Sequence, residues 1–322
     1  MHFRQPRVDR ASHVAVERAR QTLDAALPAD DQQEELHEMG KTARLRELLR
    51  QNKMLVVPGA FECITARMVE QAGFPAAYMT GAGTAASLGF PDYGLITMSE
   101  MVANAGRMAN VLGIPLIADA DTGYGNELNV VRTVREYEKH GVSGVHIEDQ
   151  GFPKRCGHLE DKEVVPLDDF LVKIRAAVSA KIDADFLIIA RTDARAVLGF
   201  DEAIRRANAS LEAGANMAFV EAPQTIEEIA AVPKQVKGPC LLNVVWKGKT
   251  PDVPLADAER FGYKLAILPG MLFKALIGAC DHMLEELKRN NRHPAPIKDM
   301  SIREGFARVG AGEWDALRER RP

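Results

Sequence analysis

Two acidic residues, Asp119 and Asp121, end a short apolar run and are separated by a single residue. Side chains two apart on a β-strand point to the same face, so both carboxylates are expected to face one space. Like charges there repel unless a cation neutralises them, and carboxylate oxygens suit Mg²⁺ or Mn²⁺. Glu148 extends this cluster, and Asp92 is placed to join it through water. The alternative is that one aspartate caps a loop while the other pairs with Arg191.

The segment from Gly151 to His158 is a second candidate centre, because it carries a thiol close to several nitrogen groups. Lys154 and Arg155 come directly before Cys156, and a histidine ends the segment. Positive neighbours are expected to lower the pKa of the thiol and to make it a usable proton donor or nucleophile near neutral pH. Glycines on both sides predict a loop that is free to close as a lid. The alternative is an ordinary basic loop with an incidental cysteine.

Further polar residues stand at the ends of other apolar runs. They are Thr80, Gly81, Arg191, Asp193, Glu221 and Asn243. The planar guanidinium of Arg191 suits bidentate capture of a carboxylate. A buried ion pair with Glu221 or Asp193 is an equal alternative, and both hold if one carboxylate positions the arginine while it binds another. His146 is expected to face the helix layer.

Eight short apolar runs alternate with helix-length segments and must position these residues. The runs are Met54–Ala60, Ala76–Gly81, Pro115–Asp121, Gly144–Asp149, Phe186–Asp193, Met217–Ala222, Pro239–Val245 and Leu265–Gly270. Thr97 with Glu100, and Thr225 with Glu228, form capping-box patterns. The glycines expected at helix ends are Gly73, Gly113, Gly141, Gly214 and Gly262. Eight such alternations predict an α/β fold, a closed parallel (β/α)₈ TIM-type barrel; a doubly wound open sheet is the alternative.

Two regions outside the eight repeats complete the predicted organisation. Residues 1–40 are predicted to form a polar, helical N-terminal extension. Residues 41–322 are predicted to form the barrel together with a C-terminal helical tail at about 290–322. That tail is longer than barrel closure needs, so it could cross to a neighbouring subunit.

Composition argues against several classes of protein. The net charge of −4 over 322 residues gives no nucleic-acid footprint, and no apolar run approaches the roughly 20 residues that span a membrane. The four cysteines show no CxxC pair, which argues against a disulfide framework or structural zinc and favours a reducing, cytoplasmic setting. Cys63, Cys240 and Cys280 are expected to be buried small apolar residues.

With these motifs in place, the sequence resembles the isocitrate lyase/phosphoenolpyruvate mutase superfamily, and within it the methylisocitrate lyase and 2,3-dimethylmalate lyase branch. The resemblance runs from about Met54 to Leu287. The matching motifs are Tyr78–Gly83, Phe90–Gly94, Asp119–Gly125, His146–Gln150, Lys154–His158 and Ile189–Asp193. The Lys-Arg-Cys-Gly-His string is highly specific for the lyase side of the superfamily.

The resemblance implies a homotetramer of barrels that exchange their last helices. It also implies a catalytic Mg²⁺ bound mainly by Asp119, with Asp92, Asp121 and Glu148 acting through water. The candidate substrate-binding residues are Thr80, Gly81, Ala82, Arg191, Glu221 and Asn243. The candidate catalytic residues are Cys156, Lys154, Arg155, His158 and Tyr78.

The implied activity is Mg²⁺-dependent retro-aldol cleavage of a small 2-hydroxy di- or tricarboxylate to a 2-ketoacid and a second carboxylic acid. Cys156 would protonate the enolate left by carbon–carbon cleavage, and Tyr78 or a metal-bound group is the candidate base. The alternatives are an oxaloacetate hydrolase or decarboxylase of the same superfamily, and a non-catalytic barrel that only binds a carboxylate.

The loop after the seventh run departs from the family pattern. Asn243 matches, but Trp246 stands where many relatives carry an acidic residue. Trp246 is expected either to narrow the pocket over an apolar substituent or to pack against a neighbouring loop. Val244 stands beside the asparagine, where oxaloacetate hydrolases of the family tend to carry a hydroxyl residue. The exact substrate is therefore left open by the sequence.

Overall fold

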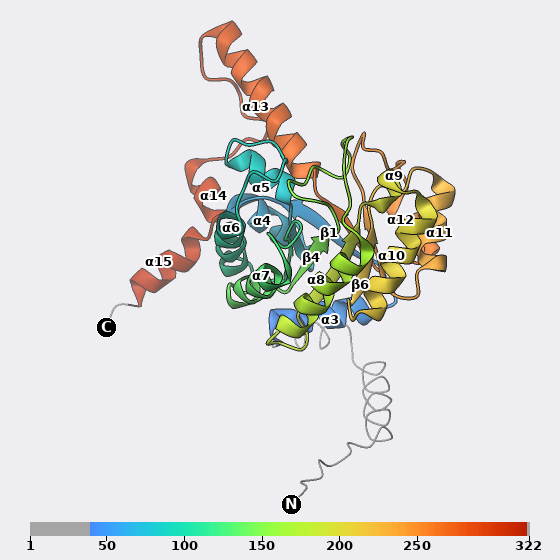
Figure 1. Ribbon diagram of the computed structural model, residues 1–322. Coiled ribbons are helices and arrows are strands. Elements are labelled where there is room, and N and C mark those ends of the chain that lie inside the picture. The colour runs from blue at the N-terminus through green and yellow to red at the C-terminus, as the bar shows by residue number, and fades with distance from the viewer. Residues whose placement is uncertain (1–38, 321–322) are drawn as a thin grey trace, which may run out of the picture. The chain divides into compact units, whose positions relative to one another are not determined.

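The computed structural model describes residues 39–320, and eight strands close into a barrel within them (Figure 1). The strands are β1 (Leu55–Ala60), β2 (Ala77–Met79), β3 (Leu116–Asp119), β4 (Gly144–Glu148), β5 (Leu187–Thr192), β6 (Met217–Val220), β7 (Cys240–Asn243) and β8 (Leu265–Leu268). Neighbours in chain order pair in parallel, and β1 also pairs in parallel with β8, which closes the sheet. The predicted (β/α)₈ barrel is confirmed, and each strand lies within its predicted run. The predicted N-terminal extension falls outside the described residues, apart from its last two positions.

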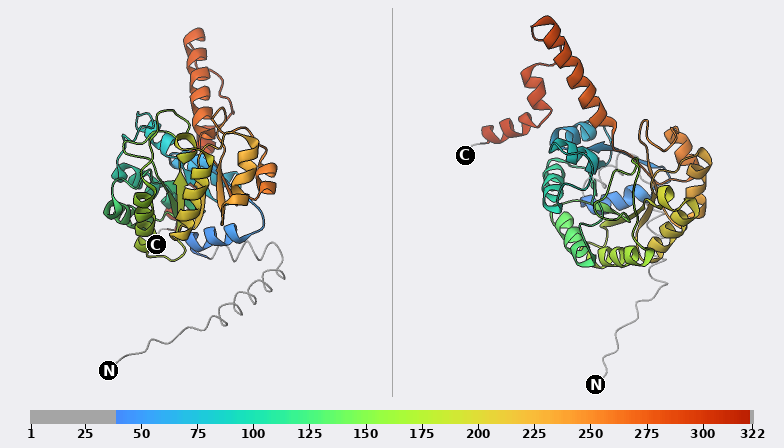
Figure 2. Two further views of the ribbon diagram at one scale, coloured as in Figure 1. Left: turned by 45° about the vertical axis from the view of Figure 1, so that its right-hand side comes forward. Right: turned by 45° about the horizontal axis from the view of Figure 1, so that its top comes forward.

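Helices surround the strands (Figure 2). Those up to β8 are α3 (Lys41–Arg50), α4 (Cys63–Gln71), α5 (Gly81–Ser87), α6 (Met98–Val111), α7 (Glu127–Lys139), α8 (Leu167–Ala180), α9 (Ala194–Val197), α10 (Phe200–Glu212), α11 (Ile226–Gln235) and α12 (Leu255–Phe261). The predicted capping box is present at Thr97 of α6. Thr225 caps α11, but the Glu228 carboxylate accepts from the backbone of Gln224 and pairs with Arg195, so that box is not reciprocal. The five predicted glycines follow α4, α6, α7, α10 and α12.

Apolar side chains fill the barrel interior toward the N-terminal ends of the strands. Leu55, Val57, Ile117, Leu187, Ile189, Met217, Phe219, Leu241, Leu265 and Ile267 belong to this one cluster. Helix α3 crosses the end of the barrel and adds Leu45 and Leu48 to it (Figure 2, right). The N-terminal end is therefore closed by a dry core, and polar chemistry is confined to the C-terminal ends of the strands.

The chain continues past β8 into α13 (Met271–Asn290), α14 (Ile302–Ala307) and α15 (Ala311–Glu319), which contain no buried residue. Leu276, Ile277, Leu284 and Leu287 of α13 are exposed. Cys280 also lies on this helix and is exposed, contrary to the prediction, because α13 leaves the barrel; Cys63 is half-buried, and only Cys240 is buried as expected. Across residues 39–320, no helix combines the length and apolarity that a membrane span requires.

Candidate active site

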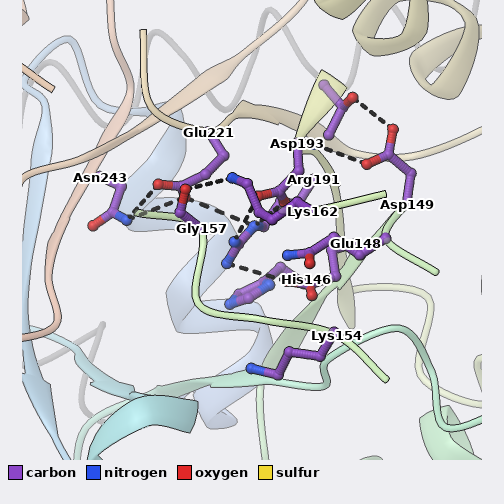
Figure 3. A network of polar contacts seen from close by, with 12 residues as sticks. His146, Glu148, Asp149, Lys154, Gly157, Lys162, Arg191, Asp193, Glu221 and Asn243 are labelled. Carbon is purple, nitrogen blue, oxygen red and sulfur yellow. Dashed lines mark hydrogen bonds and ion pairs between the residues drawn. The ribbon is translucent and has the colours of Figure 1, made fainter. Parts of the chain in front are cut away.

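The buried charged side chains of the described part gather at the C-terminal end of the barrel (Figure 3). Carboxylates stand at the ends of strands β3 to β6, and the cations come from β5, from the loop after β4 and from α10. Burying a charge is costly unless a partner compensates it. The arrangement of partners therefore decides what each group can do.

Asp119 and Asp121 meet through a turn and not through alternation along a strand. Strand β3 ends at Asp119, and Asp121 has left-handed backbone with φ 45°. The Asp119 Oδ1 accepts a hydrogen bond of 2.9 Å from the backbone N–H of Asp121. The predicted convergence holds, but the predicted geometry is wrong because the strand ends two residues earlier. A non-glycine residue in this backbone region is strained, and such strain often marks functional sites.

The turn from Thr80 to Ala82 lies directly beside this aspartate pair and begins α5. The Gly81 N–H donates to Asp119 Oδ2 at 3.2 Å, and a Cβ on Gly81 would lie only 2.5 Å from that oxygen. The Thr80 hydroxyl accepts from the backbone N–H of Gly83 and so caps the helix. Glycine is therefore needed at position 81 for close approach to a carboxylate.

Lys154 neutralises part of the acidic cluster. Its Nζ lies 2.5 Å from Asp92 Oδ1 and 2.7 Å from Asp121 Oδ1. Burial disfavours its charge, but Asp121, Asp92 and Glu148 outweigh burial and raise the pKa of Lys154 well above its ordinary value. Burial raises the pKa of Asp121 to about 6 against the pull of this lysine. The partner of Asp121 is thus Lys154, and not Arg191 as in the alternative prediction.

Arg191 is held by three carboxylates. Its Nε and Nη2 donate to the two oxygens of Asp193 at 2.8 and 3.2 Å. Its Nη1 lies 3.2 Å from Glu148 Oε2, and Nε lies 3.7 Å from Glu221. The predicted ion pair is present, and Asp193 binds one edge of the guanidinium. The remaining N–H groups of Nη1 and Nη2 are free to bind a second carboxylate, so both predicted roles are compatible.

Glu148 is the least compensated carboxylate of the group. Within the described residues, neither of its buried oxygens accepts a hydrogen bond, and its partner is the ion pair with Arg191. Burial raises the pKa of Glu148 well above its ordinary value, although Arg191 opposes this. Such a group needs either a proton or a further cation.

Cys156 is held close to the cluster by its backbone, whose N–H donates to the carbonyl of Asp92 at 3.1 Å. Burial, followed by the Asp92 carboxylate, raises the pKa of the thiol above its ordinary value. The predicted lowering is wrong because neither neighbouring cation faces the sulfur. Lys154 turns to the carboxylates, whereas the Arg155 side chain is half exposed and lies 3.7 Å from Asp161. The structure does not bring Arg155 to the other site residues.

Gly157 places the loop backbone directly on the site. A Cβ there would lie 2.5 Å from Arg191 Nη2 and 2.6 Å from Glu221 Cγ. Neither Gly157 nor Gly151 has a positive φ. Gly157 is required for space beside Arg191 and Glu221, and the predicted freedom of the loop to close stays a prediction.

His158 and Asn243 both contact Glu221. The His158 Nε2 lies 3.0 Å from Glu221 Oε1, and the backbone N–H of Lys249 donates to Nδ1 at 3.0 Å, which places the ring proton on Nε2. Asn243 Nδ2 donates to Glu221 at 3.1 Å. Burial alone would raise the pKa of Glu221, but Arg191 and His158 together hold it below its ordinary value. Glu221 is therefore a charged anchor for these groups.

His146 faces the barrel interior, contrary to the prediction. It precedes Glu148 by two residues, so both side chains occupy the same face of β4. Its Nε2 lies 2.8 Å from the hydroxyl of Tyr78 and 3.5 Å from Asp119. Burial lowers the pKa of His146 to about 4, and burial together with Asp119 raises the pKa of Tyr78 well above its ordinary value. Both groups are thus neutral around pH 7.

Three further charged residues, which were not among the predicted site residues, bind the groups that form the site. They are Asp149, Lys162 and Arg206. Asp149 accepts from the Thr192 hydroxyl at 2.6 Å, from the backbone N–H of Asp193 at 2.8 Å and from Arg206 at 2.9 Å. Lys162 lies 2.7 Å from Asp193. The sequence could have indicated Arg206, because a charged residue on the buried face of a helix needs a buried partner. It could not have indicated Lys162, since loop residues follow no periodicity.

Trp246 lies on the loop after β7, and its side chain is 65% exposed. Both of its expected roles stay predictions. The carbonyl of Trp246 accepts a hydrogen bond from Lys274 of α13. Asn243 at the end of β7 contacts Glu221, and the backbone of Lys249 in the following loop contacts His158.

The carboxylates offer oxygen donors that suit a hard cation. Among residues 39–320, no three His, Cys, Asp or Glu side chains are arranged to hold a metal directly. Mg²⁺ keeps several waters and needs only one or two carboxylates from the protein. The oxygens of Glu148 accept no hydrogen bond from the described residues, and burial raises the pKa of Asp121, so the cluster has room for further positive charge. The residues present thus fit a hydrated Mg²⁺ or Mn²⁺.

Replacing Gly157 with alanine is expected to displace the loop, because the new methyl group would overlap Arg191 and Glu221. Amide hydrogen exchange of residues 154–160 should quicken by about tenfold, as for the loss of one charge-assisted hydrogen bond. Gly151→Ala is the matched control, since its Cβ would meet nothing closer than 3.9 Å. Equal exchange in the two variants would contradict the close-contact role of Gly157.

Comparisons with known proteins agree with this geometry. A family model described as phosphoenolpyruvate phosphomutase matches residues 45–288. The 2,3-dimethylmalate lyase of Eubacterium barkeri is 48% identical over 232 residues, which cover 72% of this chain and 80% of that protein. The 2-methylisocitrate lyase of Aeropyrum pernix is 43% identical over 243 residues, which cover 76% of this chain and 78% of that protein.

Solved structures give the same result. Oxaloacetate acetylhydrolase in complex with the inhibitor 3,3-difluorooxalacetate matches with a TM-score of 0.84 at 38% identity. The match covers 86% of this chain and 96% of that one. The barrel is therefore shared with enzymes whose names refer to small di- and tricarboxylates.

Proposed function

The chain belongs to the isocitrate lyase/phosphoenolpyruvate mutase superfamily as a carbon–carbon lyase, and we propose that it cleaves a small 2-hydroxy di- or tricarboxylate resembling 2,3-dimethylmalate or 2-methylisocitrate. The products would be a 2-ketoacid and a second carboxylic acid. The single observation that carries the proposal is Cys156, a thiol kept protonated by burial on a loop whose backbone is bonded to Asp92.

Arg191 and the turn at Thr80 to Ala82 would bind the substrate. Asp193 occupies one edge of the guanidinium, so the remaining N–H groups of Arg191 can receive a substrate carboxylate. Asn243 is oriented by Glu221, and its side-chain oxygen is buried without a partner in the described residues. That oxygen would accept a hydrogen bond from a substrate hydroxyl.

Asp119 would be the main metal ligand, with Asp121, Glu148 and Asp92 as further oxygen donors. A bound Mg²⁺ would stabilise the negative charge that develops on the substrate oxygens during cleavage. Lys154 already neutralises Asp92 and Asp121 in part. Lys154 would therefore leave the Asp119 and Glu148 side of the cluster for the cation.

The proposed cleavage is balanced in protons and electrons. A base removes the proton from the substrate hydroxyl, the carbon–carbon bond breaks, and its electron pair remains on the departing carboxylate enolate. Cys156 then donates its thiol proton to the enolate carbon and is reprotonated from solvent. Tyr78 is a poor candidate for the base because its raised pKa keeps it protonated. One of the carboxylates proposed to bind the metal is the better candidate.

An oxaloacetate hydrolase is the second candidate function. It is favoured by the structural match to oxaloacetate acetylhydrolase. Val244 beside Asn243 counts against it, because valine supplies no hydroxyl group at that position. Acetate and oxalate formed from oxaloacetate would support hydrolysis, and pyruvate and CO₂ would support decarboxylation.

Cys156→Ser is expected to reduce turnover by roughly 10²- to 10⁴-fold, since it removes the general acid. The assay would offer 2,3-dimethylmalate, 2-methylisocitrate, isocitrate and oxaloacetate with Mg²⁺ and identify the products. Cys63→Ser is the control, because that thiol is half-buried on α4, away from the site. Full turnover by Cys156→Ser on the preferred substrate would overturn the acid role.

Removing divalent metal with a chelator is expected to abolish turnover. Adding Mg²⁺ or Mn²⁺ should restore it, because the protein's own cations compensate the buried carboxylates only in part. Isothermal titration of Mg²⁺ into the chelator-treated protein provides a reading that does not depend on the substrate. Asp119→Asn should weaken that binding, whereas Asp257→Asn, on the outer helix α12, should leave it unchanged.

We further propose a homotetramer in which α13 packs on a neighbouring barrel. Within one chain, α13 carries exposed Leu276, Ile277, Leu284 and Leu287 and no buried residue. A helix with an apolar stripe is stable in water when that stripe is covered.

Light scattering should give about four times the chain mass of 35.3 kDa. Leu284→Glu should shift the protein to smaller species, because it places a charge in the apolar stripe. Arg289→Glu, on the opposite face of the same helix, is the charge-changing control. A monomeric parent protein would contradict the proposed assembly.

A further inference from the structure

Lys162 is a second lysine of the loop after β4, and the chemistry proposed above gives it no role. Its side chain is only 2% exposed. The ammonium has two partners, the backbone carbonyl of Gly157 and Asp193 Oδ1 at 2.7 Å. A charge this deeply buried is costly unless its partners are fixed.

Both partners of Lys162 are in contact with site residues (Figure 3). Asp193 also receives the Nε and Nη2 of Arg191, so one carboxylate joins the lysine to the arginine. Gly157 is adjacent to Cys156 in the chain and lies against Arg191 and Glu221. Lys162 therefore links the position of the thiol to that of the guanidinium.

The ends of the loop are fixed independently of Lys162. The backbone N–H of Gly151 donates to the carbonyl of Glu163, and that of Val165 donates to the carbonyl of Asp149, both at 2.9 Å. Lys162 is next to Glu163, so its backbone belongs to the fixed base of the loop. Its side chain reaches from this base to the outer part of the loop at Gly157.

Lys154 and His158 also hold this loop through buried pairs with Asp121 and Glu221, whereas two other ion pairs of its outer part are exposed. Arg155 pairs with Asp161, whose side chain is 85% exposed, and Lys249 pairs with an exposed Glu160. Exposed pairs contribute little, because water competes for both charges. Opening the loop at Gly157 would, by contrast, remove an acceptor from a buried ammonium.

We propose that Lys162 is a positioning residue that holds the loop closed, with Cys156 beside the substrate, by bridging Gly157 to the Asp193–Arg191 pair. Its consequence for turnover rests on the function proposed above. Its consequence for the loop does not, because closure is a property of the protein without substrate.

Alkylation of Cys156 by iodoacetamide measures loop closure without turnover. The rate is taken at its high-pH plateau and quantified by peptide mass spectrometry, so that a change of thiol pKa does not enter. Lys162→Met should raise the rate about tenfold, the ratio expected for losing one hydrogen bond to a charged group. Lys162→Arg retains a cationic donor and should stay close to the parent protein. Lys237→Met, at an exposed pair on the outside of the barrel, is the control.

An unchanged alkylation rate in folded Lys162→Met protein would overturn the proposal. Circular dichroism checks the fold, and Lys162→Gln, which retains a neutral donor, replaces Lys162→Met if that variant is unfolded. Its rate should also rise, because the neutral amide cannot form an ion pair with Asp193. Cys63 in the same samples should react equally in all variants.

Turnover gives the second reading. In Lys162→Met, kcat should fall by about tenfold or more, with recovery in Lys162→Arg, because misplacement by even about 1 Å reduces the rate strongly. If the parent protein converts none of the four candidate acids, the proposed function fails, whereas the alkylation result still decides the role of Lys162. If kcat of folded Lys162→Met equals that of the parent, the positioning role is contradicted.

Discussion

The compensation of buried negative charge is the constraint on which the rest of the site depends. In the described part of the chain, six carboxylates are buried at the C-terminal end of the barrel: Asp119, Asp121, Glu148, Asp149, Asp193 and Glu221. Among the cations that the structure describes around them, Arg191 alone lies on a strand. A barrel strand can present a carboxylate at its end, but the strands alone do not supply enough cations. The remaining positive charge has to arrive from loops or from solution.

Two of the compensating cations, Lys154 and Lys162, belong to the loop that carries Cys156. In the position that the structure shows, this loop therefore supplies part of the positive charge that neutralises the carboxylates. The two lysines pair with Asp92, Asp121 and Asp193 and not with the thiol. The thiol therefore lies in a buried and locally negative environment. This explains why the pKa of Cys156 rises although two cations precede it in the sequence. A protonated thiol suits a general acid better than a nucleophile.

The barrel separates stability from chemistry along its axis. Apolar side chains and α3 fill the interior toward the N-terminal end, whereas the polar side chains continue the same inward-facing positions toward the C-terminal end. The alternation that places Leu187 and Ile189 in the core also places Arg191 in the site. Behind the site, Asp149 and Arg206 connect β4 and β5 to the helix layer. A strained turn at Asp121 and left-handed backbone at Ala222 flank the carboxylates.

Periodicity in the sequence was sufficient to predict the barrel, because each short apolar run between helical segments can be satisfied only by a strand buried on both faces. The same alternation placed most site residues at strand ends, and the Lys-Arg-Cys-Gly-His string indicated the family. Alternation failed to predict where a side chain points when that depends on contacts between segments that are distant in the sequence. Lys154 and Lys162 reach carboxylates on other loops, whereas Arg155 turns to Asp161 of its own loop, and no local pattern specifies these partners. Burial and charge pairing, which only the tertiary structure decides, set the direction of the thiol pKa, the inward orientation of His146 and the need for space at Gly157.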